Sequence, residues 1–132
     1  MKKQPQKPTA SELEILHVLW SKGPSTVRDV LGALNQTKDM GYTGVLKLLQ
    51  IMTAKGTVRR NESQRAHVYE ACRPAEQTKR QLASDMLQRV FQGSASQLMM
   101  HALEGHSASA EEIEELRRIL DSYKGDEDGK RK

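Results

Sequence analysis

The chain has 132 residues and a net charge of +4, and 36% of its residues are hydrophobic but only 4% are aromatic. This length suits one small domain with an appendage, and no apolar run approaches the roughly 20 residues that a membrane-spanning helix needs. Residues 1–8 form a basic tail without a following apolar stretch, so we expect no signal peptide. The single cysteine, Cys72, cannot form an internal disulfide, as is typical of a protein in a reducing cytoplasm.

The charge is distributed unevenly along the chain. Residues 1–73 contain 12 Lys and Arg against 6 Asp and Glu, whereas residues 74–132 contain 9 against 11. A basic first part and a slightly acidic second part favour a polyanionic partner for the first part.

Two helices are predicted at the start of the first part. Thr9 and Glu12 have the spacing of a capping box, and we expect a helix over residues 10–22 that ends at Gly23-Pro24. Apolar residues then follow at largely helical spacing, namely Leu13, Leu16, Val18, Leu19 and Trp20. Ser25 or Thr26 then caps a second helix over residues 26–36, with an apolar face of Val27, Val30, Leu31 and Leu34.

A third helix follows the turn at residues 38–41. It is expected to begin at Tyr42 or Thr43 and to end at Lys55, with Gly56 as a left-handed cap. At about 100° per residue one face is apolar, formed by Val45, Leu48, Leu49 and Met52. The opposite face holds Thr43, Lys47, Gln50 and Ala54, with Ile51 beside them. Its small, polar and cationic side chains are suited to entering a nucleic-acid groove.

Two short strands are predicted after the third helix. Residues 57–60 and 66–70 have β character and are separated by a loop over residues 61–65. Val58 and Val68 are expected to face inward, and Tyr69 to anchor the hairpin to the helices. Three helices followed by a hairpin are the order of a winged helix-turn-helix domain, which we assign to residues 9–73.

Three amphipathic helices are predicted in the second part. They cover residues 74–92, a short segment around Leu98 to Leu103 that ends near Gly105, and residues 110–124, which open with a capping box of Ser109 and Glu112. Their apolar stripes are too large to remain solvated. They either fold back on the winged helix or pair with a second chain. Folding back would cover a DNA-binding surface, which favours pairing, so we assign residues 74–124 to dimerisation and residues 125–132 to a disordered tail.

Several segments of the chain together resemble the penicillinase repressor family, which includes the BlaI and MecI β-lactam-resistance repressors and the CopY copper repressors. The segments occur in the family's order and spacing, and they span about residues 9–124. They are residues 11–16 (SELEIL), 19–20 (LW), 27–30 (VRDV), 42–45 (YTGV), 55–56 (KG), 65–69 (RAHVY), 90–95 (VFQGSA) and 111–116 (EEIEEL).

The resemblance implies a homodimeric repressor without enzymatic activity. Each winged helix would place its third helix in a major groove of a palindromic operator, and the C-terminal helices would interlock. In the β-lactam branch, a membrane sensor-protease causes cleavage in the arm. The candidate DNA-binding residues are Tyr42, Thr43, Gly44, Lys47, Gln50, Arg59, Arg60 and Arg65. The candidate dimer-interface and core residues are Leu87, Val90, Phe91, Leu98, Leu103, Leu116, Ile119 and Leu120.

The chain departs from the family pattern at positions that affect specificity and induction. Gly44 stands where the family usually has Thr, and Ile51 where it often has Arg, so the operator sequence is not implied. His101-Ala102 replaces the Asn-Phe bond that is cut in the resistance repressors. The His101-Ala102 bond is the possible cleavage site, but a protease specific for the aromatic residue would lack the side chain that it recognises. The C-terminus lacks the cysteines of the copper branch.

Other classes of function have less support in the sequence. The four histidines are not spaced as converging metal ligands, and no nucleophile–base pair or glycine-rich phosphate loop is present. We therefore expect no metal, no cofactor and no enzyme, and the sequence identifies no ligand pocket. Two alternatives stay open: a winged-helix adaptor that binds protein instead of DNA, and a repressor of this family that answers another signal.

Overall fold

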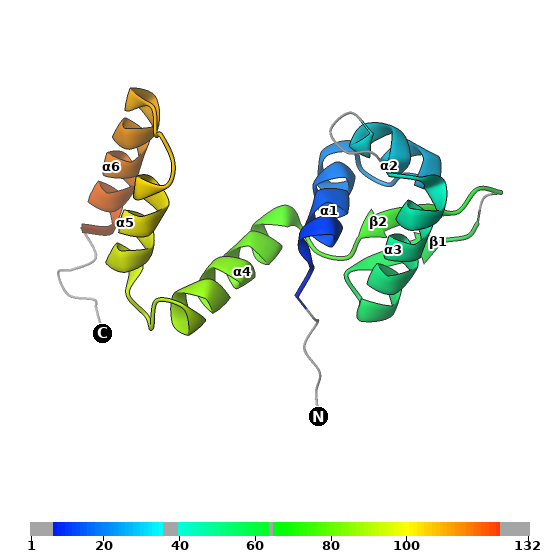
Figure 1. Ribbon diagram of the computed structural model, residues 1–132, viewed down its shortest axis with the longest axis horizontal. Helices are drawn as coiled ribbons and strands as arrows, with labels where there is room; N and C mark the ends of the chain where they lie inside the picture. Colours follow the sequence, from blue (N-terminus) through cyan, green and yellow to red (C-terminus); the bar gives the residue numbers. More distant parts are fainter. Residues whose placement is uncertain (1–6, 36–39, 64, 125–132) are drawn as a thin grey trace. The chain divides into compact units, whose positions relative to one another are not determined.

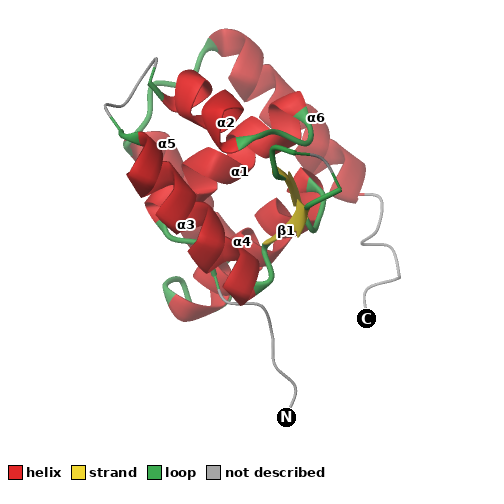
Figure 2. Ribbon diagram, turned by 90° about the vertical axis from the view of Figure 1, so that its right-hand side faces the viewer, coloured by secondary structure: helices red, strands yellow, loops and turns green. Residues whose placement is uncertain are grey.

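The computed structural model describes residues 7–35, 40–63 and 65–124. Their elements follow in the order α1 (Ala10–Lys22), α2 (Val27–Leu34), α3 (Tyr42–Lys55), β1 (Val58–Asn61), β2 (Val68–Ala71), α4 (Ala75–Arg89), α5 (Ala95–Glu104) and α6 (Ala110–Lys124) (Figure 1). The described elements are mainly helical, with one small antiparallel hairpin (Figure 2), as predicted. The chain divides into two compact units, residues 1–84 and 85–132. Residues 1–6 and 125–132 of the expected tails, and residues 38–39 of the turn expected before α3, lie outside the described residues.

Side-chain caps set where the first helices begin. The backbone N–H of Glu12 donates to Thr9 Oγ1, and the N–H of Thr9 donates to Glu12 Oε1, so the predicted capping box is confirmed. Thr26 and Asp29 form the same reciprocal pair at the start of α2. Because these bonds satisfy amides that have no partner within the helix, they fix the first turn.

The end of α3 depends on a glycine. Gly56 adopts φ 87° and ψ 12°, the left-handed conformation that ends many helices, and its N–H donates to carbonyls of the last turn. A side chain at this backbone conformation would be strained. The chain therefore turns directly from α3 into β1, as the sequence predicted.

The hairpin is joined to the helical body through a residue distant in sequence. Ser25 and Tyr69 exchange backbone hydrogen bonds of 2.9 and 2.8 Å, and this bridge places Ser25 alongside β2. Tyr69 is 1% exposed and belongs to the core, as predicted. Because successive side chains of a strand point to opposite faces, Val68 faces away and is only half-buried. The prediction that Val68 faces inward is wrong.

One hydrophobic core holds α1, α2, α3 and the hairpin together. The predicted apolar residues of the three helices are buried or packed against this core, but Ile15, which the sequence analysis left out, is also fully buried. The buried members are Ile15, Leu16, Leu19, Val27, Val30, Leu34, Val45, Leu49, Met52, Val58 and Tyr69.

A buried ion pair connects the start of α1 to the end of α3. Lys55 Nζ lies 2.9 Å from Glu12 Oε1 and 3.1 Å from Oε2, and the side chains are 18% and 3% exposed. Glu12 thus accepts from the Thr9 amide at the start of α1 and from Lys55, the last residue of α3, which lies 43 positions after Glu12. This contact restrains α3 relative to α1.

Helices α4, α5 and α6 differ in part from the predicted ranges. Helix α4 ends at Arg89, three residues early, because Gln92 and Gly93 have φ of 51° and 87° and end the helical path. Helix α5 begins at Ala95, where the Ser94 hydroxyl accepts from the Gln97 amide. In α6 the Ser109 hydroxyl accepts from the Glu112 amide, and the Glu112 carboxylate lies 3.2 Å from His106 Nε2.

Replacing Glu12 with Gln should destabilise the folded chain by about 2–3 kcal/mol. The half-buried Lys55 amine would lose its counterion, and its partial exposure keeps the cost below the range of fully buried pairs. Urea unfolding at a fixed protein concentration measures the effect. The matched control is Glu62→Gln, which removes the carboxylate of an exposed pair with Arg60 and should cost less than about 1 kcal/mol. Equal losses in the two variants would contradict the role assigned to Glu12.

Candidate nucleic-acid interface

The outward face of α3 presents the predicted polar residues together. Thr43, Gly44, Lys47 and Gln50 are exposed, and Ile51 is 39% exposed. On the opposite face Val45, Leu49 and Met52 are fully buried. Burial of one face and the ion pair at Lys55 hold the helix in place. The exposed face is therefore a rigid, mostly uncharged surface with one cation, Lys47, among the described residues of that face.

The three predicted wing arginines have different surroundings. Arg59 Nε donates to Glu70 Oε2 at 2.7 Å, and this bond raises the pKa of Arg59 further above its ordinary value. Arg60 lies 2.5 Å from a Glu62 oxygen, and hydrogen bonds with Tyr69 and Glu62 raise the pKa of Arg60. Arg65 instead lines a groove beside the helices. Two of the three cations are therefore already balanced by carboxylates of the wing.

This groove lies between the starts of α2 and α3 and the wing. We call it the wing groove; its volume is about 310 Å³. The guanidinium carbon of Arg28 lies 5.5 Å from the centre of the Tyr42 ring, within the range of a cation–π contact. The residues that line the groove are Thr26, Val27, Arg28, Tyr42, Leu46, Arg65, Ala66, His67 and Tyr69.

Sequence analysis missed Arg28 and His67 as members of this surface. Arg28 comes from α2 and His67 from the segment before β2, and both are exposed. They meet Tyr42 and Arg65 only because the Ser25–Tyr69 bridge brings the wing to the start of α2. The only local signal was their charge within two of the family-like segments.

Asp29, the acidic residue nearest to Arg28 in the sequence, caps its own helix, α2. Asp29 Oδ2 accepts from the Thr26 backbone N–H at 3.0 Å. This bond, followed by the Thr26 side-chain bond, lowers the pKa of the Asp29 carboxyl. The carboxylate therefore completes the α2 cap and is not among the residues that line the wing groove.

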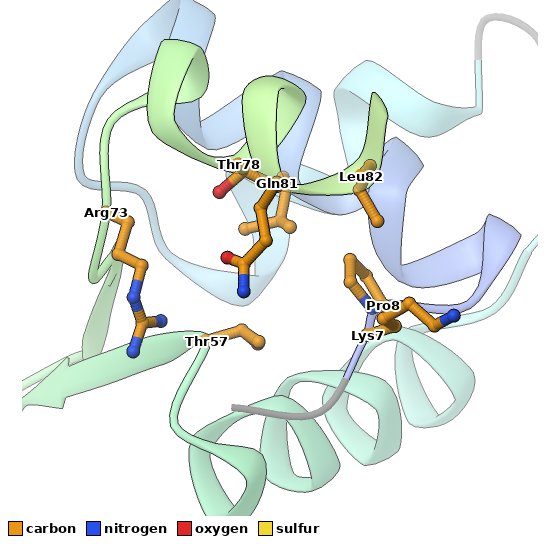
Figure 3. Close-up of a pocket in the computed structure, with 8 residues that line it drawn as sticks. Lys7, Pro8, Thr57, Arg73, Thr78, Gln81 and Leu82 are labelled. Carbon is orange, nitrogen blue, oxygen red and sulfur yellow. The ribbon is translucent and has the colours of Figure 1, made fainter. Parts of the chain in front are cut away.

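A second, smaller pocket lies at the start of α4 (Figure 3). Arg73 Nη1 donates to the Gly56 carbonyl, and Trp20 Nε1 donates to the Arg73 carbonyl at 3.0 Å. Lys7, Pro8, Leu16, Thr57, Thr78, Gln81 and Leu82 complete the lining. The sequence did not identify this pocket. Its lining holds no nucleophile–base pair, and in the close-up the Arg73 and Lys7 side chains stand at opposite sides.

The second unit carries its apolar side chains at the surface. Val90 is 63% exposed and Leu120 is 56% exposed, and Ile119 is also exposed. The other predicted interface residues, Leu87, Phe91, Leu98, Leu103 and Leu116, are half-buried. The sequence analysis did not name Met86, Met100 and Tyr123 for the interface, and all three are exposed. His101 and Ala102 are exposed on α5, with the His101 ring 5.7 Å from that of Phe91.

The remaining histidines and the cysteine are scattered. His17 packs edge-on against Trp20 at 5.4 Å, His67 lines the wing groove, and His106 contacts Glu112. Within the described ranges no three His, Cys, Asp or Glu residues are grouped to hold a metal ion. Cys72 is a half-buried free thiol. None of the described helices is long and apolar enough to span a lipid bilayer.

Comparisons with known proteins identify relatives over most of the chain. The penicillinase repressor family model matches residues 8–122. A transcriptional regulator BlaI of Mycobacterium tuberculosis is 33% identical over 111 residues, which are 83% of this chain and 79% of that protein. A penicillinase repressor of Bacillus licheniformis is 27% identical over 124 residues, 94% of this chain and 96% of that protein.

Two further matches are more distant. The methicillin resistance regulatory protein MecI of Staphylococcus aureus is 22% identical over 112 residues, 85% of this chain and 91% of that protein. The solution structure of the monomeric form of Bacillus licheniformis BlaI in complex with the blaP half-operator is 20% identical, with a TM-score of 0.49. This match covers 57% of this chain and 92% of that chain.

Proposed function

The chain belongs to the penicillinase repressor family, a family of transcriptional repressors and not of enzymes, and from this premise we propose that it represses transcription by binding a palindromic operator as a homodimer. One observation carries the proposal: a fixed helix, α3, presents Thr43, Lys47 and Gln50 on its exposed face beside a cationic groove. A helix of this kind can enter the major groove of DNA, where base edges can be distinguished. Such a repressor acts in the bacterial cytoplasm, where its operator lies.

Within this interface α3 would read the bases. Gln50 has the amide that pairs with adenine by two hydrogen bonds, and Lys47 can reach a guanine or a phosphate. Tyr42, at the first turn, lies at the edge of the wing groove and would face the DNA backbone. The uncharged positions Gly44 and Ile51 allow close approach and apolar contact.

Lys47→Ala and Gln50→Ala should weaken operator binding in different ways. If Lys47 contacts a phosphate, its loss weakens binding to all duplexes. The slope of log affinity against log salt concentration should then become less steep by about one unit. Loss of Gln50 should relax the base preference at one position, at a cost of about 1–3 kcal/mol on the preferred operator. Fluorescence anisotropy with operator and single-base variants measures both. Two variants that bind like the wild type would contradict the role of α3, and a wild type that does not retard duplex DNA would favour the adaptor.

The exposed apolar residues of the second unit support a homodimer. Burying a Leu or Phe side chain contributes about 1.5–3 kcal/mol, so several such residues from each chain can exceed the free-energy cost of association. Leu120 and Val90 remain mostly exposed in the single chain. A second copy of this unit would cover them and would place two winged helices on the two halves of one operator.

Leu120→Glu should convert the dimer to a monomer at micromolar concentration. The variant places a charge in the proposed interface, and two copies are affected in each dimer, so the dissociation constant should rise by at least about 100-fold. Sedimentation velocity measures the change. Arg118→Glu is the control, because helical spacing places Arg118 on the other side of α6. A wild-type chain that sediments as a monomer would exclude the dimer.

We infer that loss of the dimer is also the route of induction. A cut in α5 near His101-Ala102 would separate α6 from α4 and remove Leu116, Ile119 and Leu120 from the interface. A membrane sensor-protease is the partner that the β-lactam branch supplies. Ala102 lacks the aromatic side chain at which the resistance repressors are cut, so this chain can instead answer a different signal through the same interface.

A specific protease site placed at residues 101–102 of the intact chain tests whether such a cut is sufficient. Cleavage of the purified protein should lower affinity for the full operator by about 100-fold or more, because two tethered half-site contacts bind far better than one. Affinity for a half-operator should change little. The same site placed within residues 125–132 is the control and should leave both affinities unchanged. An unchanged affinity for the full operator after complete cleavage at 101–102 would exclude this route.

A further inference from the structure

We propose that the wing groove holds one phosphate of the DNA backbone between Arg28 and Arg65, and that this contact supplies more of the general DNA affinity than the outward face of α3. The inference rests on the proposed function, since it concerns the same DNA. It adds a binding site for the sugar–phosphate backbone, built from α2 and the wing.

The charges around the groove favour an anion. Arg28, Arg65 and His67 line it, and no acidic residue is among the described residues of its lining. In the described parts of the chain no carboxylate forms an ion pair with Arg28 or Arg65, whereas Arg59 and Arg60 are paired with Glu70 and Glu62. An arginine that already holds a carboxylate must break that contact to bind phosphate. The two groove arginines bind without this cost.

The groove is also held in shape before any ligand arrives. The Arg28 guanidinium lies over the Tyr42 ring at 5.5 Å, which restrains a long side chain that would otherwise lose more conformational freedom on binding. The wing side, with Arg65 and His67, is tied to α2 by the two Ser25–Tyr69 hydrogen bonds. Both arginines therefore line a groove whose two sides are held together by contacts of the folded unit.

The surroundings identify the anion as backbone phosphate. The groove adjoins the first turn of α3 through Tyr42 and Leu46, so a duplex whose bases meet Lys47 and Gln50 would have its backbone at the starts of α2 and α3. A volume of about 310 Å³ exceeds that of one phosphate and leaves room for the adjoining sugar. The outward face of α3 carries one cation among its described residues, so most of the phosphate contacts must come from elsewhere.

The test compares Arg28→Gln, Arg65→Gln and the double variant with Arg59→Gln as the matched control. Fluorescence anisotropy is measured with an operator duplex and a scrambled duplex at several salt concentrations, after unfolding midpoints show that each variant is folded. Each groove variant should lose about tenfold in affinity for both duplexes, as expected for a charge-assisted hydrogen bond. Arg59→Gln should lose less than about threefold.

Three further readouts distinguish one phosphate that both arginines contact from a general effect of positive charge. The loss of affinity in the double variant should be smaller than the product of the two single losses, because both arginines hold the same phosphate. The slope of log affinity against log salt concentration should become less steep by about one unit. A methylphosphonate that neutralises the contacted phosphate should remove the effect of Arg28→Gln. If the wild type binds DNA but both groove variants match Arg59→Gln, the wing groove proposal is overturned while the proposed function stands. The proposal would also be overturned if the affinity losses of the single variants multiplied in the double variant and no single methylphosphonate removed the effect of Arg28→Gln.

Discussion

The contact between Glu12 and Lys55 is the constraint on which the placement of α3 depends. The Glu12 carboxylate caps α1 through the Thr9 amide and also accepts from the Lys55 amine, the last residue of α3. A lysine in the last turn also interacts favourably with the helix dipole. Buried ion pairs contribute little net stability but penalise arrangements in which either charge is left alone. The pair therefore orients α3 against α1, and Gly56 fixes where the chain leaves it.

The two units differ in whether they bury their own apolar side chains. The first unit buries residues from three helices and both strands in one core, so it can order the exposed side chains of α3 by itself. In the described part of the second unit no side chain is buried. Its amphipathic helices therefore do not cover their apolar residues within the unit itself, and these residues need a further surface to pack against. Under the proposed function, one chain would suffice to read DNA and tight binding would need two, so association would be the natural point of control.

Local signals in the sequence predicted the elements whose ends depend on neighbouring residues. The bounds of α1 and α6 agree with prediction, and α3 ends as predicted, because their start and stop residues act within one turn. The wing shifted by one or two residues, and Val68 was placed on the wrong face, because its register depends on the bridge between Ser25 and Tyr69. Arg28 and His67 were missed for the same reason. The groove that they line exists only after segments about 40 residues apart have met.

Contacts within the folded chain do not explain why position 44 is a glycine. A glycine in the first turn of a helix costs about 0.5–1 kcal/mol relative to alanine. Packing does not require it, since a Cβ built at Gly44 meets no atom within 4 Å, and its φ is not in the left-handed region. The loss of stability therefore has no compensation within the folded chain. Gly44 lies on the exposed face with Thr43 and Lys47, where the proposed operator would approach the backbone of α3. Under the proposed function, close approach of DNA at this turn would give the missing compensation, and the operator rather than the fold would select the residue at position 44.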